Sequence, residues 1–410
     1  MNPWLLLILS CLVIAFLVEV IVDILNLRHL STTVPQEFTD VIDTAQYKRS
    51  QEYLKDNTYL QFVSSAINVA AIIAFIIFGG FEMVDAIARS FLLPSWMTGL
   101  IFAGLIVAAF WMLQLPFSLF HTFVIEERYG FNRTTGLTFF LDLCKGILLT
   151  VVIGGAVFVG IVWFFESFGD NAWWLCWLAL ALLQLFLTAI APVVILPLFN
   201  RFTPLEEGAL SNAIEEYARS QGLELQGIFV MDGSRRSAKT NAFFTGWGRW
   251  KRIVLFDTLI EKHSVDEIIA VLAHEVGHRK KRHVIKMIQL SILSMGIKLY
   301  VLSLLINNRL LFDAFGMTHL SVYASLFFFA ILYFPVDMVL SVGINALFRR
   351  YEFQADLFAA TTSQPQSMIN VLKKLAVENL SNLTPHPWKV IVEDSHPPVV
   401  ERIRAIRARP

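Results

Sequence analysis

The segment His274-Glu275-Val276-Gly277-His278 has the spacing HExxH. It closes a helical pattern that starts at Ser264, because Ser264 and Glu267 form a capping-box pair and apolar residues follow at helical spacing. Residues four positions apart share a face of a helix, so both imidazoles point toward one site. There they can hold a metal ion, with the glutamate within reach of a water at that ion.

The chemistry that this motif favours is hydrolysis at a zinc ion. Zinc lowers the pKa of its water to about 7, and Glu275 is placed to take the proton as a general base. Gly277 is unfavourable inside a helix by about 1 kcal/mol, which is consistent with a close neighbour at that position. The simpler alternative is an ordinary helix without a metal.

A third zinc ligand is expected, because catalytic zinc sites have three protein ligands and one open position. A second helical pattern, RRYEFQAD at 349–356, places Glu352 and Asp356 one turn apart. Glu352 can be the ligand, and Asp356 can accept the N–H of a ligating histidine and fix its tautomer. Taken alone, the two carboxylates are better explained as exposed groups on a helix. Two histidines alone would be an incomplete ligand set for catalytic zinc, and this favours the interpretation of Glu352 as the third ligand.

Outside these helices the chain is predominantly apolar. Of its 410 residues 56% are hydrophobic and 16% are charged, against about 25% charged in soluble domains. Seven stretches are long enough to span a bilayer. They are residues 4–27, 62–81, 97–120, 141–168, 172–199, 284–311 and 320–347. The fold class is therefore mainly α, with seven transmembrane helices and polar segments at 200–283 and 348–410.

Lysine and arginine fix the predicted orientation. The side that holds both polar segments carries 28 of these residues outside the spans, and the opposite side carries 2. Positive charge marks the cytoplasmic side, so both polar segments are expected in the cytoplasm and the N-terminus outside. We divide the chain into a membrane unit, 1–199, and a metallopeptidase unit, 200–410.

Several charged residues fall inside the predicted spans, where charge is costly unless it faces a bundle interior or water. They are Glu19, Asp23, Asp142, Lys145, Glu166, Lys298 and Asp337. One explanation is an internal aqueous space, and the alternative is a position near the membrane interface. Six histidines have no partner at ligand spacing and therefore indicate no site. They are His29, His121, His263, His283, His319 and His386.

Two further motifs complete a family pattern. They are TNAFFTG at 240–246, followed by RIVLFDTL at 252–259, and SHPPVVER at 395–402. With HEVGH and the ExxxD at 352–356, the chain resembles the type I CAAX prenyl proteases, which are membrane zinc metalloproteases of the gluzincin kind. The resemblance covers nearly the whole chain. It implies seven helices in a ring around a water-filled chamber, and a cytoplasmic zinc domain with a small β-region.

The resemblance also implies roles for individual residues. The zinc ligands are His274, His278 and Glu352, the general base is Glu275, and Asp356 lies behind the ligands. His396 is expected to act in catalysis. Substrate or the transition state is expected to contact Asn241, Ala242, Phe243 and Arg402. The strand predicted at Asn241 can bind an extended peptide at its edge. Without the family, Arg402 would be an ordinary surface residue of a charged helix.

The expected function is removal of the C-terminal tripeptide from prenylated CaaX proteins, with zinc as cofactor. The expected partners are the peptide substrate and the lipid bilayer. A net charge of zero argues against nucleic acid, and we expect a monomer in a bacterial inner membrane or a eukaryotic ER membrane. Two alternatives remain: the same chemistry on unprenylated membrane proteins, and a transporter or receptor with structural zinc.

Overall fold

A computed structural model describes residues 2–245 and 252–408. Within them, seven helical segments are long and apolar enough to cross a membrane, which confirms the predicted number and the mainly helical class. Four segments are single helices: α1 (Pro3–Arg28), α2 (Thr44–Ile77), α13 (His283–Leu305) and α15 (Val322–Thr362). The other three are pairs joined by π-helical turns: α4 (Ser95–Phe120) with α5 (Glu126–Arg128), α6 (Gly136–Leu149) with α7 (Gly155–Ser167), and α8 (Ala172–Ile190) with α9 (Leu196–Phe199).

Three of the predicted spans had wrong limits. Helix α2 begins at Thr44, where Asp43 caps it by accepting the Gln46 N–H at 2.7 Å, and it ends before Gly79, which has a φ of +67°. Helix α13 stops at Leu305, and α14 (Arg309–Ala314) follows it. Helix α15 runs past 347 to Thr362. Hydropathy detects the apolar part of a helix and misses its polar continuation.

The predicted β-region is a four-stranded sheet. Its order is β1 (Phe202–Pro204), β2 (Gly227–Met231), β4 (Arg252–Phe256) and β3 (Ala242–Thr245). Strands β2 and β4 are parallel, and the other two pairs are antiparallel. Strand β3 therefore lies at an edge, with one side free of strand partners in the described residues.

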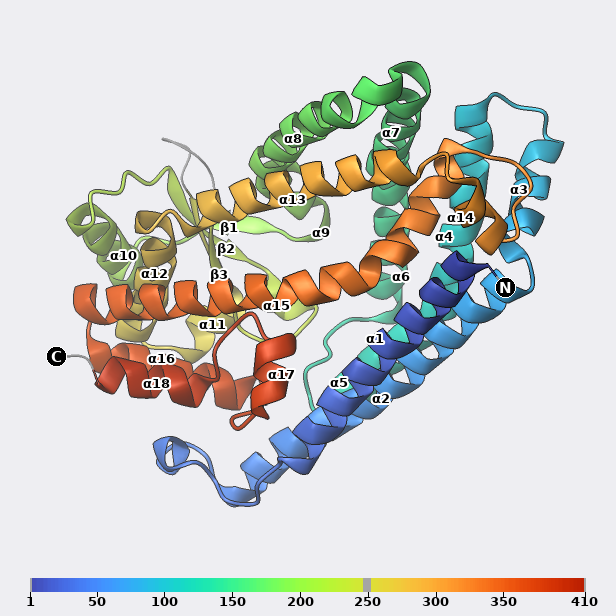
Figure 1. The fold of residues 1–410 in the computed structure, drawn as a ribbon. Helices are drawn as coiled ribbons and strands as arrows, with labels where there is room; N and C mark the ends of the chain where they lie inside the picture. Colours follow the sequence, from blue (N-terminus) through green and yellow to red (C-terminus); the bar gives the residue numbers. More distant parts are fainter. Residues whose placement is uncertain (1, 246–251, 409–410) are drawn as a thin grey trace.

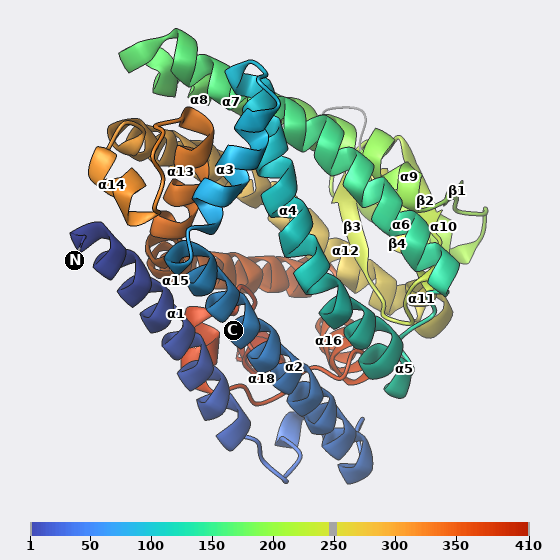
Figure 2. The same cartoon turned by 90° about the vertical axis from the view of Figure 1, so that its right-hand side faces the viewer.

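The remaining α-helices are shorter than the seven spans. They are α3 (Gly80–Ser90), α10 (Ala209–Ser220), α11 (Asp257–Lys262), α12 (Val265–Lys280), α16 (Pro365–Glu378), α17 (Pro387–Val392) and α18 (Val399–Arg407). The sheet, α10, α12, α16 and α18 gather at one end of the molecule, and α13 and α15 run from there to the other end (Figure 1). Figure 2 shows α1 and α2 side by side along one flank. A buried cluster joins Ile253 of β4, Leu272 of α12, Val371 of α16 and Ile403 of α18.

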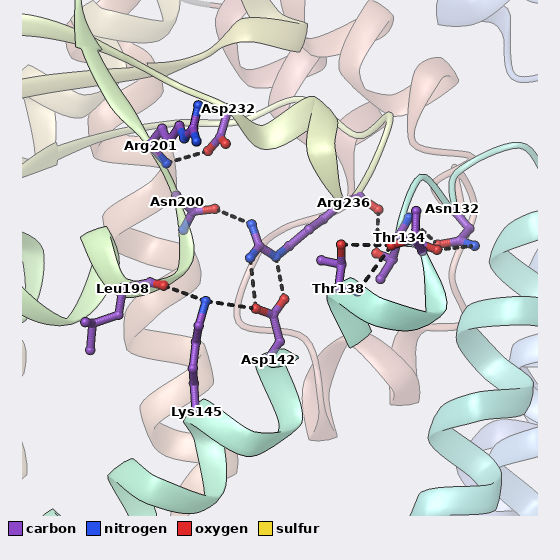
Figure 3. Close-up of polar contacts among 11 residues, drawn as sticks. Asn132, Thr134, Thr138, Asp142, Lys145, Leu198, Asn200, Arg201, Asp232 and Arg236 are labelled. Atoms are coloured by element: carbon purple, nitrogen blue, oxygen red, sulfur yellow. Dashed lines mark hydrogen bonds and ion pairs between the residues drawn. The ribbon is translucent and has the colours of Figure 1, made fainter. Parts of the chain in front are cut away.

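The charges predicted at membrane depth have polar partners. Arg236, after β2, donates to both oxygens of Asp142 on α6 at 2.8 and 3.0 Å (Figure 3). Lys145 donates to the carbonyl of Leu198 at 2.8 Å. The other pairs are Asp23 with Lys389, Lys298 with Asp337, Glu166 with Ser95, and Glu19 with Gln61 and Ser65. Each of these charges therefore contacts another polar group of the protein, and the Arg236–Asp142 pair ties the segment after β2 to helix α6.

Gly277 lets α12 and α15 approach closely. A Cβ at this position would lie 3.0 Å from the Ala355 Cα, 3.1 Å from its carbonyl oxygen and 3.1 Å from the Phe358 Cβ. The first two of these atoms belong to the backbone, so they cannot move aside as a flexible side chain could. The close neighbour suggested by the sequence is thus the helix that carries Glu352 and Asp356.

We expect Gly277→Val to destabilise the protein by about 1–3 kcal/mol, because the added carbons must force the two helices apart. Thermal unfolding of the purified protein in detergent measures the effect. The matched control is Gly160→Val, since Gly160 lies in helix α7 with open space around its Cα. Equal melting temperatures for the two variants would contradict this account of Gly277.

Candidate metal centre and active site

Helix α12 begins where the sequence predicts. Ser264 Oγ accepts the Glu267 N–H at 3.3 Å, and the Glu267 carboxylate accepts the Ser264 N–H at 3.0 Å. These two bonds satisfy backbone donors that a helix start leaves unpaired. The fixed start and the buried face of Ile268, Leu272 and Val276 set the rotation of the helix. His274, Glu275 and His278 consequently face α15 and the cavities beside it.

Three potential metal ligands converge between α12 and α15. The Nε2 atoms of His274 and His278 are 3.1 Å apart, and the Glu352 carboxylate lies 3.5 Å from the first and 3.2 Å from the second. One ligand atom from each residue falls within 4.8 Å of the others. Two imidazole nitrogens and one carboxylate oxygen are one of the donor sets found in catalytic zinc sites, so the residues fit this metal.

A second layer of polar groups lies behind the ligands. His274 Nδ1 is 2.8 Å from Asp356 Oδ1, so the histidine can donate there and keep Nε2 free for a metal. Arg402 of α18 donates to both oxygens of Asp356 at 2.7 and 2.6 Å, and its guanidinium lies 3.5 Å from Glu352. Without the family resemblance the sequence did not predict these contacts, because Arg402 was interpreted as a surface residue. The arginine joins the C-terminal helix α18 to the candidate metal site.

Glu275 lies between two cavities. One, of about 350 Å³, is lined by Asn241, Ala242, His274, Glu352, His396 and Arg402 together with Glu275. The other, of about 610 Å³, is mainly apolar and is lined by Phe243 and Phe244 of β3, His278, Pro192 and Leu196. Burial raises the pKa of the Glu275 carboxyl, which is the direction that suits a general base. All the residues predicted to contact substrate line one of these two cavities.

Two of the residues predicted to act on substrate, His396 and Asn241, line the smaller cavity. His396 Nδ1 is 3.1 Å from the Glu352 carboxylate, and its side chain is 68% exposed, so it can reach a ligand in the cavity. Asn241 precedes edge strand β3, its carbonyl accepts the Phe256 N–H at 3.1 Å, and its amide oxygen accepts the Ala242 N–H at 2.8 Å. Gly246, which ends the TNAFFTG motif, lies outside the described residues.

Two family models divide the chain between them. Residues 23–201 match the model described as CAAX prenyl protease N-terminal, five membrane helices, and residues 204–410 match peptidase family M48. The chain belongs to family M48. Membership confirms the resemblance to the CAAX prenyl proteases and makes the protein a membrane metallopeptidase.

Relatives in family M48 match over almost the full length. A CAAX prenyl protease 1 homolog of Arabidopsis thaliana is 35% identical over 98% of this chain and 97% of its own. The CAAX prenyl protease 1 of Saccharomyces cerevisiae is 31% identical over 98% and 95%. The crystal structure of S. mikatae Ste24p superposes with a TM-score of 0.94, at 31% identity and 99% coverage of both chains. The whole fold is thus that of S. mikatae Ste24p.

Asp356→Asn is expected to weaken zinc binding by about 10–100-fold, because partners behind metal ligands typically contribute that much. The amide keeps the size of the side chain and loses the negative charge that holds His274 and Arg402. Zinc retention against a chelator series measures the change. Asp313→Asn is the control, since Asp313 also binds an arginine, at 2.9 Å, but far from the site. Equal zinc retention in both variants would contradict the role of Asp356.

Proposed function

We propose that the protein is a zinc endopeptidase that removes the last three residues from proteins ending in a prenylated CaaX sequence. The observation that carries the proposal is the convergence of His274, His278 and Glu352 beside Glu275, in cavities lined by the edge strand β3. The names of the full-length relatives support the CaaX substrate. An edge strand can bind an extended peptide tail by backbone hydrogen bonds.

The residues of the site supply most of the chemistry. Bound zinc would polarise the scissile carbonyl and acidify the attacking water. Glu275 would take one proton from that water and deliver it to the leaving amine, so that the C–N bond breaks as a new carboxylate and a new amine terminus form. His396, exposed in the cavity, would donate a hydrogen bond to the negative charge that develops on the carbonyl oxygen.

The binding side of the cavity would hold the tail in place for this reaction. Asn241, Ala242 and Phe243 would align the peptide along β3, and Arg402 would keep Asp356 and Glu352 oriented through the contacts described above. The mainly apolar cavity of about 610 Å³ beside Glu275 is suited to apolar parts of the substrate.

We further propose that the zinc site and the C-terminus face the cytoplasm and that the protein acts as a monomer. The lysine and arginine distribution supports the orientation. The boundary between the membrane unit and the metallopeptidase unit near residue 200 follows the change from apolar spans to polar segments. A water-filled chamber inside the helices would let a flexible tail reach Glu275 and would keep folded domains out.

The identity of the cleaved bond tests the proposal. Purified protein with zinc would be incubated with a farnesylated CaaX peptide, and the masses of the products measured by mass spectrometry. The Glu275→Gln variant serves as the blank. We expect a product shortened by the C-terminal tripeptide, absent from the blank. Cleavage at another bond, or cleavage that persists in the blank, would refute the proposal.

A further inference from the structure

His283 lies directly behind the metal ligand His278. It is the first residue of α13 and is fully buried. Its Nδ1 is 3.2 Å from the Nδ1 of His278, and its Nε2 is 3.0 Å from the amide oxygen of Gln354 on α15. Sequence spacing alone gave no reason to single out His283, since it is five residues from His278 and its other partner is 71 residues away.

Only one arrangement of the hydrogens along these contacts leaves Nε2 of His278 free to bind a metal. The Gln354 oxygen only accepts, so His283 Nε2 carries the hydrogen and its Nδ1 carries the lone pair. That lone pair accepts the Nδ1–H of His278. The lone pair of His278 Nε2 is then free at the position where the ligand atoms of His274, His278 and Glu352 converge. The opposite direction would place a hydrogen on the ligating nitrogen and prevent coordination.

We propose that His283 is a positioning residue for the metal centre, and that Gln354 fixes its tautomer. The proposal rests on the metal site put forward above. It gives each ligating histidine its own outer partner: the charged pair of Asp356 and Arg402 behind His274, and a neutral relay of His283 and Gln354 behind His278. The neutral relay orients the second ligand without adding another charge to the buried site.

A packing role alone is the competing explanation, because His283 also stacks on Tyr351, with ring centroids 4.1 Å apart and planes 8° from parallel. His283→Phe separates the two roles. Phenylalanine keeps an aromatic ring for Tyr351 and removes both nitrogens. His263→Phe is the matched control, since His263 is also buried and its ion-pair partners, Glu267 and Glu378, are not metal ligands.

The measurement is the zinc dissociation constant of the full-length protein in detergent, obtained by competition with a chelator, with the melting temperature of the metal-free protein beside it. We expect His283→Phe to weaken zinc binding about 10–100-fold, whereas the control stays near wild type. Zinc affinity for His283→Phe within twofold of wild type would overturn the proposal.

A pair of variants at Gln354 tests the direction of the relay even if His283→Phe does not fold. Gln354→Glu still accepts the His283 Nε2–H, so zinc affinity should be kept. Gln354→Leu removes the acceptor, so affinity should fall severalfold. Equal zinc affinities for these two variants would contradict the relay. Because the readout is metal affinity, it is independent of which substrate the enzyme cleaves.

Discussion

Glu275→Gln is expected to lower kcat by at least about 100-fold and to leave zinc bound. General acid–base groups contribute about 10²–10⁴-fold to such reactions, and glutamine cannot accept the proton of the attacking water. Glu275 lines both cavities beside the metal ligands but is not one of the three converging ligands. Its replacement should therefore separate catalysis from metal binding.

Two measurements on one preparation check this: the rate of peptide cleavage and the zinc content per molecule. The control is Glu261→Gln, because Glu261 is an exposed glutamate on α11, away from the centre. We expect full activity and full zinc content in the control. An active Glu275→Gln enzyme would show that another group takes the proton, and loss of zinc would show that Glu275 supports the metal.

Glu352→Gln is expected to abolish activity for a different reason, which is loss of the metal. In the proposed site the Glu352 carboxylate would supply the third ligand, and an amide oxygen is a weaker ligand for zinc. Zinc affinity should fall by more than the about 10–100-fold expected for an outer partner. Added zinc should restore part of the activity, which it cannot do for Glu275→Gln.

Zinc titration of cleavage activity makes the comparison, with Glu216→Gln as the control because Glu216 is exposed on α10. Stoichiometric zinc in purified Glu352→Gln, with activity intact, would remove Glu352 from the ligand set. In the proposed site Glu352 would contact the metal and Asp356 would act through His274. Glu352→Gln should therefore lose zinc more readily than Asp356→Asn.

Local sequence signals predicted the parts of the site that depend on local structure. Ser264 and Glu267 fix the start of α12, and helical periodicity places His274 and His278 on one face. The pairing of this helix with 349–356 followed from the ligand count that zinc requires. Hydropathy gave the seven spans but misplaced the end of the last one, because α15 continues as a polar helix that carries Glu352 and Asp356.

The remaining features depend on contacts between distant segments. Arg402 reaches Asp356 across 46 residues, and His283 reaches Gln354 across 71. No pattern within either segment distinguishes such residues from an ordinary surface arginine or a solitary histidine. The order of the sheet, which leaves β3 at an edge, likewise depends on the crossover that pairs β2 with β4. Family resemblance indicated Arg402, and the structure supplied its partner.

The central claim is that this metal centre acts on prenylated tails. Its most direct test compares kcat/KM for a farnesylated CaaX peptide and for the same peptide without the farnesyl group, using the zinc-loaded protein in detergent. We predict release of the C-terminal tripeptide from the farnesylated peptide and little or none from its unmodified twin. Equal rates for the two peptides would contradict the claim and would point to a zinc peptidase of broader specificity.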